Sequence, residues 1–206
     1  MNQAPTAEAP AHVVVRPVRT LPSDVGVAVV VLGALLLALL LRYSVDGGTK
    51  PYQSPDQGFS IEYPSSWRPT DVTDTLLLRV ENPQARSAYK TNVSIEVRDL
   101  DPSSPPTIQE LVDRRVVQAG GLTGYHFISS MERNVAGARA SEVEYAFVSQ
   151  PIGTLRSASL PVVVRTRENI VVARDRTYYI TLSAPEDDFA RATEQFDRML
   201  QSVKIR

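Results

Sequence analysis

The apolar and polar positions divide the chain into one long hydrophobic segment near the N-terminus and a series of shorter, alternating segments. Residues 25–41, VGVAVVVLGALLLALLL, carry no charged or strongly polar side chain. Because a helix rises about 1.5 Å per residue, this segment would extend over roughly 25 Å, the short end of what a bilayer core requires. The pattern therefore predicts one transmembrane helix over residues 24–42.

Two other interpretations of this segment are less favoured. The apolar core of a cleaved signal peptide is about 7–15 residues long and ends in small residues at the cleavage site. Here the leucines at 39–41 lead directly into Arg42, Tyr43 and Ser44. A helix buried in a globular core usually keeps a polar face, which this segment lacks. An uncleaved signal anchor is therefore the prediction.

The orientation of the anchor is predicted from the lengths of its flanks. The basic residues around it do not determine the orientation, because Arg16 and Arg19 precede the anchor and Arg42 and Lys50 follow it. Short tails usually stay in the cytoplasm, whereas long domains are translocated largely regardless of charge. We expect a single-pass protein of the cell membrane with a cytoplasmic N-terminus and an extracytoplasmic C-terminal domain.

Composition changes on both sides of the apolar segment. Residues 1–23 are rich in proline and alanine, which predicts a flexible tail. Residues 43–55 contain Gly47, Gly48 and two prolines, which predicts a linker that interrupts any continuing helix. Residues 56–206 remain for one compact domain that is long enough to bury a hydrophobic core.

This domain opens with segments in which apolar and polar residues alternate. Phe59, Ile61 and Tyr63 alternate with Ser60 and Glu62, a period of two that predicts a strand with one buried face. The same pattern predicts further strands at 76–81, 91–99, 125–133, 138–149, 161–173 and 177–183.

Two helices are predicted from capping signals that precede apolar stripes. Thr107 and Glu110 have the spacing of a capping box, which predicts a helix through residue 119. Ser183 and Glu186 have the same spacing and predict a helix over the C-terminal region. The element order β-β-β-α-β-β-β-β-α and the short connections favour an α+β fold with helices packed on an antiparallel sheet.

Two segments of the domain resemble PsbP-like domains, the superfamily of the lumenal extrinsic subunit of photosystem II. Residues 58–67, GFSIEYPSSW, are similar to the opening motif of these domains. Residues 178–184, YYITLSA, and a helix ending in MLQSV at 199–203 are similar to the closing pattern. The likeness covers the chain from about Pro51 to its end. It implies an α/β/α sandwich around a curved antiparallel sheet, export from the cytoplasm and no enzymatic activity.

Composition and motifs argue against most kinds of reactive site. The chain has no cysteine, which excludes disulfides, thiolate catalysis and Cys-ligated metals, and its net charge of −1 gives no electrostatic case for nucleic acid. His126 has no accompanying G-x-S-x-G motif. Asp99 and Asp101, or the acidic run at 186–188, could bind a hard cation, but a turn and a helix N-terminus account for them. We predict no catalytic residue, no cofactor and no metal.

Three aromatic residues are candidates for contact with a partner. Tyr178 and Tyr179 are adjacent in a predicted strand, so one ring is expected in the core and the other on the opposite, exposed face. Trp67 follows Pro64, which ends its strand; packing over the edge of the core is the favoured role and ligand contact the alternative.

These features predict a non-catalytic accessory subunit, anchored in the bilayer through residues 25–41 and packed on integral membrane subunits of a larger complex that it stabilises or helps to assemble. The resemblance implies a complex of photosynthetic or respiratory electron transport. The alternative is an envelope carrier that binds a small molecule or a lipid between sheet and helix. A hydrolase that uses His126 as its base is a third hypothesis.

Overall fold

The computed structural model describes residues 22–46, 48–72, 76–150 and 160–206, and it describes side chains in the first helix at 25–38. The predicted tail at 1–23 therefore lies almost entirely outside the described residues. The chain divides into two compact units, Met1–Tyr43 and Ser44–Arg206.

The first unit contains most of α1, Pro22–Asp46, a helix of 25 residues. The helix predicted at 24–42 is confirmed as a helix, and it is longer than predicted at both ends. Its large apolar side chains between Val25 and Leu37 are exposed. In the part of the chain that the structure describes, no helix has both the length and the hydropathy needed to cross a membrane.

The second unit is built around a seven-stranded antiparallel sheet with the order β3-β4-β5-β9-β8-β7-β6. Its strands confirm those predicted between residues 76 and 183, and β3 is an addition. Their bounds are β3 Arg68–Pro69, β4 Leu76–Glu81, β5 Asn92–Asp99, β6 His126–Val135, β7 Ala138–Ser149, β8 Val162–Ala173 and β9 Arg176–Pro185.

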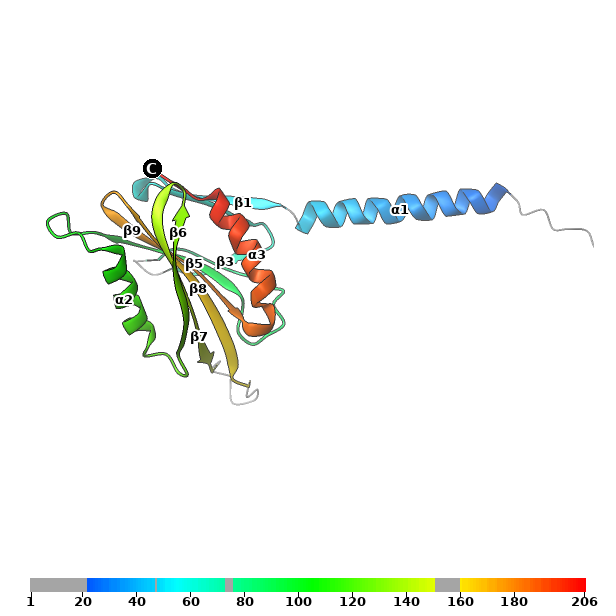
Figure 1. Ribbon diagram of the computed structural model, residues 1–206. Coiled ribbons are helices and arrows are strands. Elements are labelled where there is room, and N and C mark those ends of the chain that lie inside the picture. The colour runs from blue at the N-terminus through cyan, green and yellow to red at the C-terminus, as the bar shows by residue number, and fades with distance from the viewer. Residues whose placement is uncertain (1–21, 47, 73–75, 151–159) are drawn as a thin grey trace, which may run out of the picture. The chain divides into compact units, whose positions relative to one another are not determined.

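Two helices cover opposite faces of this sheet (Figure 1), α2 at Ile108–Ala119 and α3 at Glu186–Ser202. The capping box of α2 is confirmed, because Thr107 Oγ1 accepts a hydrogen bond from the Glu110 N–H and Glu110 accepts one from the Thr107 N–H. The capping box predicted for α3 is wrong. Ser183 lies within β9, where its hydroxyl bonds to that of Thr166 at 3.0 Å, and Pro185 precedes the helix instead.

A second, three-stranded sheet has the order β1-β2-β10 and consists of β1 Thr49–Ser54, β2 Phe59–Pro64 and β10 Lys204–Ile205. The 3₁₀ turn η1, Pro55–Gln57, joins its first two strands. The linker predicted at 43–55 is wrong for most of its length, because residues 43–46 belong to α1 and residues 49–54 form β1. Pro51 is tolerated in β1 because this is an edge strand, where a missing N–H breaks no required bond. The Tyr52 hydroxyl donates to the Leu77 carbonyl at 2.7 Å, which ties β1 to the main sheet.

The core lies on both faces of the main sheet. The larger cluster contains Trp67, Tyr178 and Phe196 and joins the sheet to α3 and β2. The smaller cluster contains Leu111, Val143 and Tyr179 and joins the sheet to α2. The fold is therefore α+β with an antiparallel sheet between helical layers, as predicted, and the small sheet adds to the α3 side.

Candidate functional site

The most concentrated group of buried polar side chains lies on the α2 face of the main sheet. Ser94, Thr181 and Glu168 are register partners across β5, β9 and β8, so their side chains share this face. Glu168 is 0% exposed although it is charged. A charged group at such a position requires a partner of opposite charge, and α2 supplies one.

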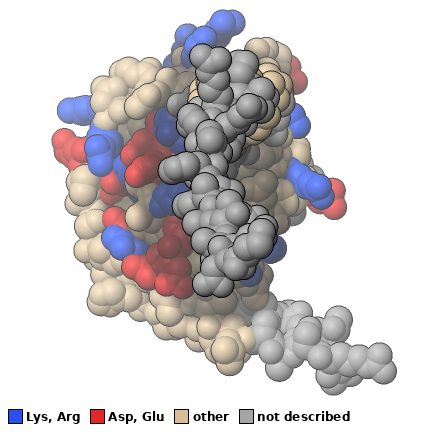
Figure 2. Space-filling model, turned by 90° about the vertical axis from the view of Figure 1, so that its right-hand side faces the viewer, with Lys and Arg blue, Asp and Glu red and all other residues tan. Residues whose placement is uncertain are grey.

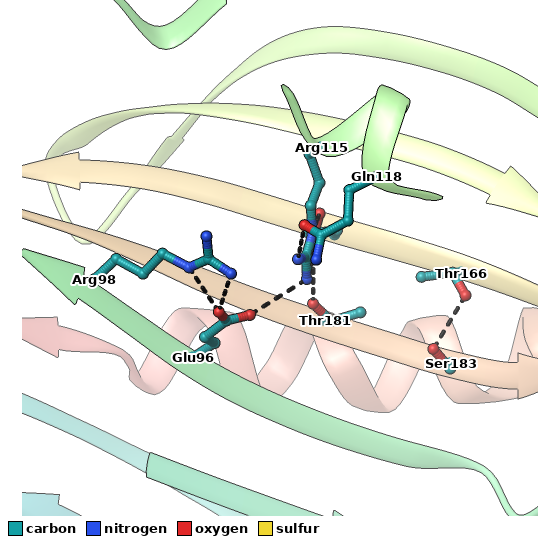
Figure 3. Close-up of polar contacts among 8 residues, drawn as sticks. Glu96, Arg98, Arg115, Gln118, Thr166, Thr181 and Ser183 are labelled. Carbon is teal, nitrogen blue, oxygen red and sulfur yellow. Dashed lines mark hydrogen bonds and ion pairs between the residues drawn. The ribbon is translucent and has the colours of Figure 1, made fainter. Parts of the chain in front are cut away.

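Arg115 of α2 reaches down onto the strands (Figure 3), where it holds Glu168. Its Nε lies 2.8 Å and its Nη2 lies 2.7 Å from the two carboxylate oxygens of Glu168. Thr181 donates to Glu168 at 2.7 Å, and Gln118 accepts from Arg115 Nη1 at 3.0 Å. Two parallel N–H bonds fix the plane of the guanidinium as well as its charge. The pair therefore sets the position of α2 on the sheet.

A second acid and a second arginine extend this network toward β5. Glu96 lies 3.5 Å from Arg115 Nη2 and accepts a hydrogen bond from Arg98 Nε at 2.7 Å. The guanidiniums of Arg98 and Arg115 both lie over the ring of Tyr179, at 5.6 and 5.0 Å from its centroid. Tyr179 thus contacts two cations that β5 and α2 hold in place.

The charges and the burial around the network raise the pKa of Arg115 and of the adjacent Tyr145. Burial lowers the pKa of Arg115, but the hydrogen bond and the charge of Glu168 outweigh it and raise the pKa above its usual value. Burial, reinforced by the negative charge of Glu168, raises the pKa of Tyr145. Both oxygens of Glu168 are occupied by Arg115 and Thr181, so this carboxylate serves as a fixed structural anion and does not face a substrate.

A cleft of about 440 Å³ opens beside this network. The loop at 99–106 forms one wall, and α2 forms another with Arg114, Arg115 and Gln118. Thr177 and Tyr179 contribute from β9. The cleft is polar, which differs from the deep apolar pocket that a lipid carrier would require.

The opposite face carries a second polar hollow of about 410 Å³ beside α3. There Arg167 donates from Nε to Glu142 at 2.6 Å and lies 3.0 Å from Asp197 of α3. Asn169 lies in the same hollow and is 1% exposed. Figure 2, a view onto the right-hand side of Figure 1, shows acidic and basic side chains interspersed. Neither sign of charge dominates the part of that side that the grey atoms leave visible.

The three aromatic residues predicted to contact a partner are all buried. Tyr178 and Tyr179 point to opposite faces, as predicted, but they are only 2% and 5% exposed. The expected exposure of one ring is wrong, because a helical layer covers each face of the sheet. Trp67 is 2% exposed and packs in the larger cluster, which is the favoured of its two predicted roles. Partner contact by these residues stays a prediction.

The other residues considered from the sequence lie apart from the network. His126 is exposed at the start of edge strand β6, where it pairs with Ala146. Asp101 bonds to the N–H and hydroxyl of Ser103, and these bonds lower the pKa of its carboxyl. Within the described ranges, no group of three or more His, Asp or Glu side chains is placed to hold a metal ion.

Sequence reasoning missed Arg115, Glu168, Arg167 and Glu142. One signal for them was present in β8, where arginine and glutamate interrupt an otherwise apolar strand at 162–173. A charge in the middle of a central strand must be buried unless one face is wet, so a buried ion pair was the available prediction. The sequence could not show which arginine pairs with Glu168, because Arg115 and Glu168 are 53 positions apart.

Comparison with known proteins identifies the fold. A family model described as PsbP matches residues 47–205. The solution structure of cyanobacterial PsbP from Synechocystis sp. PCC 6803 superimposes with a TM-score of 0.57 at 15% identity, covering 77% of this chain and 92% of that chain. No curated protein gives a significant match.

Two other bacterial structures share the architecture. LpqN of Mycobacterium tuberculosis, described as involved in cell envelope biogenesis, has a TM-score of 0.52 at 10% identity, covering 77% of this chain and 90% of that one. PA94 of Pseudomonas aeruginosa, of unknown function, has a TM-score of 0.51 at 15% identity, covering 77% and 97%. At these identities the likeness concerns the fold alone.

Proposed function

This chain belongs to the PsbP family, and we propose that it is a non-catalytic accessory subunit of a larger membrane protein complex. In this proposal residues 25–41 anchor the chain in the cell membrane. The tail before them is cytoplasmic and the PsbP domain is extracytoplasmic. The domain packs on integral membrane subunits and stabilises or helps to assemble them, and the family membership favours a complex of photosynthetic or respiratory electron transport.

The observation that carries the proposal is the uninterrupted apolar run at 25–41, followed closely by the folded domain. α1 ends at Asp46 and β1 begins at Thr49. A connection this short leaves the domain within reach of the bilayer surface and of subunits embedded in it. A tether of this kind raises the effective concentration of the domain at a partner, so a modest interface is sufficient.

The surface near β6 supports contact with another protein. Phe127, Ile128 and Met131 lie on β6, an edge strand of the described sheet, and are each about two-fifths exposed. Apolar side chains on an unpaired strand edge are uncommon on proteins that act alone. They support a protein partner for this edge of the sheet.

The absence of cysteine allows a direct test of the proposed topology. We expect a single cysteine introduced by Arg191→Cys, on the exposed surface of α3, to react in intact cells with a maleimide that cannot cross membranes. Ala7→Cys, in the N-terminal tail, should react only after permeabilisation. The reverse labelling pattern would show that the domain is cytoplasmic and would contradict this part of the proposal.

The accessory role is tested by extracting the full chain in mild detergent and separating the extract under native conditions. We expect the chain to co-migrate with a larger membrane species, and Leu32→Arg combined with Leu36→Arg to abolish this. Each arginine at the centre of a span costs about 2.5–3.5 kcal/mol, so the anchor fails to insert. Leu32→Val with Leu36→Val is the matched control and should behave as wild type. Migration of the wild-type chain solely as a free monomer would contradict the proposal.

A further inference from the structure

Both carboxylates that line the cleft beside α2 already accept hydrogen bonds from neighbouring groups of the domain. These acidic residues are Asp99 and Asp101. Asp99 accepts a hydrogen bond from Arg176 Nε at 3.0 Å, and Asp101 accepts two hydrogen bonds from Ser103. The carboxylates of the lining therefore already have partners. A cationic ligand would have to compete with these contacts.

Two arginines that line the cleft, unlike its carboxylates, still have groups that can bind a ligand. Arg98 uses Nε and Nη2 on Glu96, and its Nη1 has no hydrogen-bond partner among the described residues. Arg114 lines the cleft from the exposed surface of α2, and among the described residues no acidic side chain lies within ion-pairing distance of it. A guanidinium presents five donors in a planar fork that matches the oxygens of phosphate or carboxylate.

The lining of the cleft includes a buried threonine hydroxyl that has no hydrogen-bond partner among the described residues. Thr177 is 0% exposed, lines the cleft, and lies opposite Arg98 in the pairing of β5 with β9. Its Oγ1 is buried and has no hydrogen-bond partner within the described ranges of the chain. A buried hydroxyl left unpaired is destabilising, so such an atom in a native protein calls for an explanation. A ligand that accepts its hydrogen bond supplies one.

We propose that this cleft binds a small oxyanion, a phosphate group, through Arg98, Arg114 and the hydroxyl of Thr177. Arg98 and Arg115 are held against Tyr179 before any ligand arrives, so little side-chain freedom is lost on binding. The phosphate is either a soluble phosphomonoester or the headgroup of an anionic lipid. The site lies wholly within the PsbP domain and does not depend on the proposed membrane role.

The proposal is tested by titrating the full chain, in non-ionic detergent, with inorganic phosphate at constant ionic strength in a calorimeter. We expect saturable binding with one site, which chloride at the same ionic strength does not reproduce. Arg114→Ala should weaken binding about tenfold or more, because a charge-assisted hydrogen bond is lost. Thr177→Val, which keeps the shape and removes the hydroxyl, should also weaken binding by at least severalfold.

The matched control is Arg198→Ala, which removes an equally exposed helical arginine from α3, on the other face of the sheet. It should leave phosphate affinity unchanged. Equal weakening by Arg114→Ala and Arg198→Ala would reduce the effect to general charge attraction and overturn the proposal. A lack of saturable binding would overturn it as well, as would a Thr177→Val variant that is more stable than wild type and binds phosphate equally well.

Two further arms distinguish the sources of the phosphate. The chain is placed in phosphatidylcholine nanodiscs with and without phosphatidylglycerol, and the phosphate titration is repeated. Loss of phosphate binding only with phosphatidylglycerol identifies the lipid headgroup as the occupant, and retained binding in both identifies a soluble phosphate. Either result supports the oxyanion site, and neither bears on whether the chain joins a larger complex.

Discussion

Replacing Arg115 by methionine is expected to lower the free energy of unfolding by about 3–5 kcal/mol, the loss seen when a buried charge is left without its partner. Glu168 is 0% exposed and accepts hydrogen bonds from Arg115 Nε and Nη2. Methionine keeps the apolar length of the side chain and removes the guanidinium. The carboxylate would then remain in the core with Thr181 as its hydrogen-bond donor. Urea unfolding monitored by circular dichroism measures the difference.

Two further variants show whether charge burial causes this loss. Arg191→Ala removes an arginine from an ion pair with Asp188 on the exposed surface of α3 and should cost about 0.5 kcal/mol or less. The double variant Arg115→Met with Glu168→Met should recover most of the lost stability, because a well-packed apolar pair can replace a buried ion pair. If the double variant loses as much free energy of unfolding as Arg115→Met and Glu168→Met lose together, the ion pair is not what positions α2.

Replacing Trp67 by alanine is expected to lower the free energy of unfolding by about 3–5 kcal/mol. The indole is 2% exposed and packs in the cluster that joins the main sheet to α3 and β2. Its removal leaves a cavity that the surrounding strands can fill only in part, so lost transfer energy and lost packing add. The same urea titration gives the value, and an unchanged slope with denaturant shows that the native state keeps its compactness.

Trp67 was also considered as a partner-binding residue, and matched variants separate the two roles. Trp67→Phe keeps an aromatic ring in the core and should cost clearly less than alanine. Phe127→Ala removes an aromatic ring that is 42% exposed on β6 and should change stability little. A Trp67→Ala chain that unfolds like wild type but no longer joins the proposed membrane complex would assign the indole to the interface instead.

The elements of the domain were largely predictable, because the signals for them are local. The strand at 76–81 and the strand at 138–149 have the predicted bounds, since alternation over a few residues records which face is buried. The capping box at Thr107 was equally readable, because both of its hydrogen bonds lie within one turn of helix. The spacing of Ser183 and Glu186 predicted a capping box that is not present, because a serine at this position can also lie inside a strand.

Elements stabilised by distant contacts could not be found in this way. β1 contains Pro51 and has weak alternation, and it exists because β2 offers a free edge and Leu77 accepts a bond from Tyr52. β10 has only two residues, and it pairs with β2 from the other end of the chain. Neither segment has a local preference strong enough to predict a strand.

The amino-acid sequence by itself determined the apolar segment at 25–41, the order of the main strands and helices, and the likeness to the PsbP family. Only the tertiary structure decided that Tyr178 and Tyr179 are both covered, that Arg115 holds Glu168, and that the Thr177 hydroxyl at a polar cleft has no partner in the described part of the chain. The physical reason is the distance along the chain over which each interaction acts. Hydrophobic periodicity and helix capping depend on residues that are close in sequence, whereas burial and ion pairing depend on which distant elements the fold brings together.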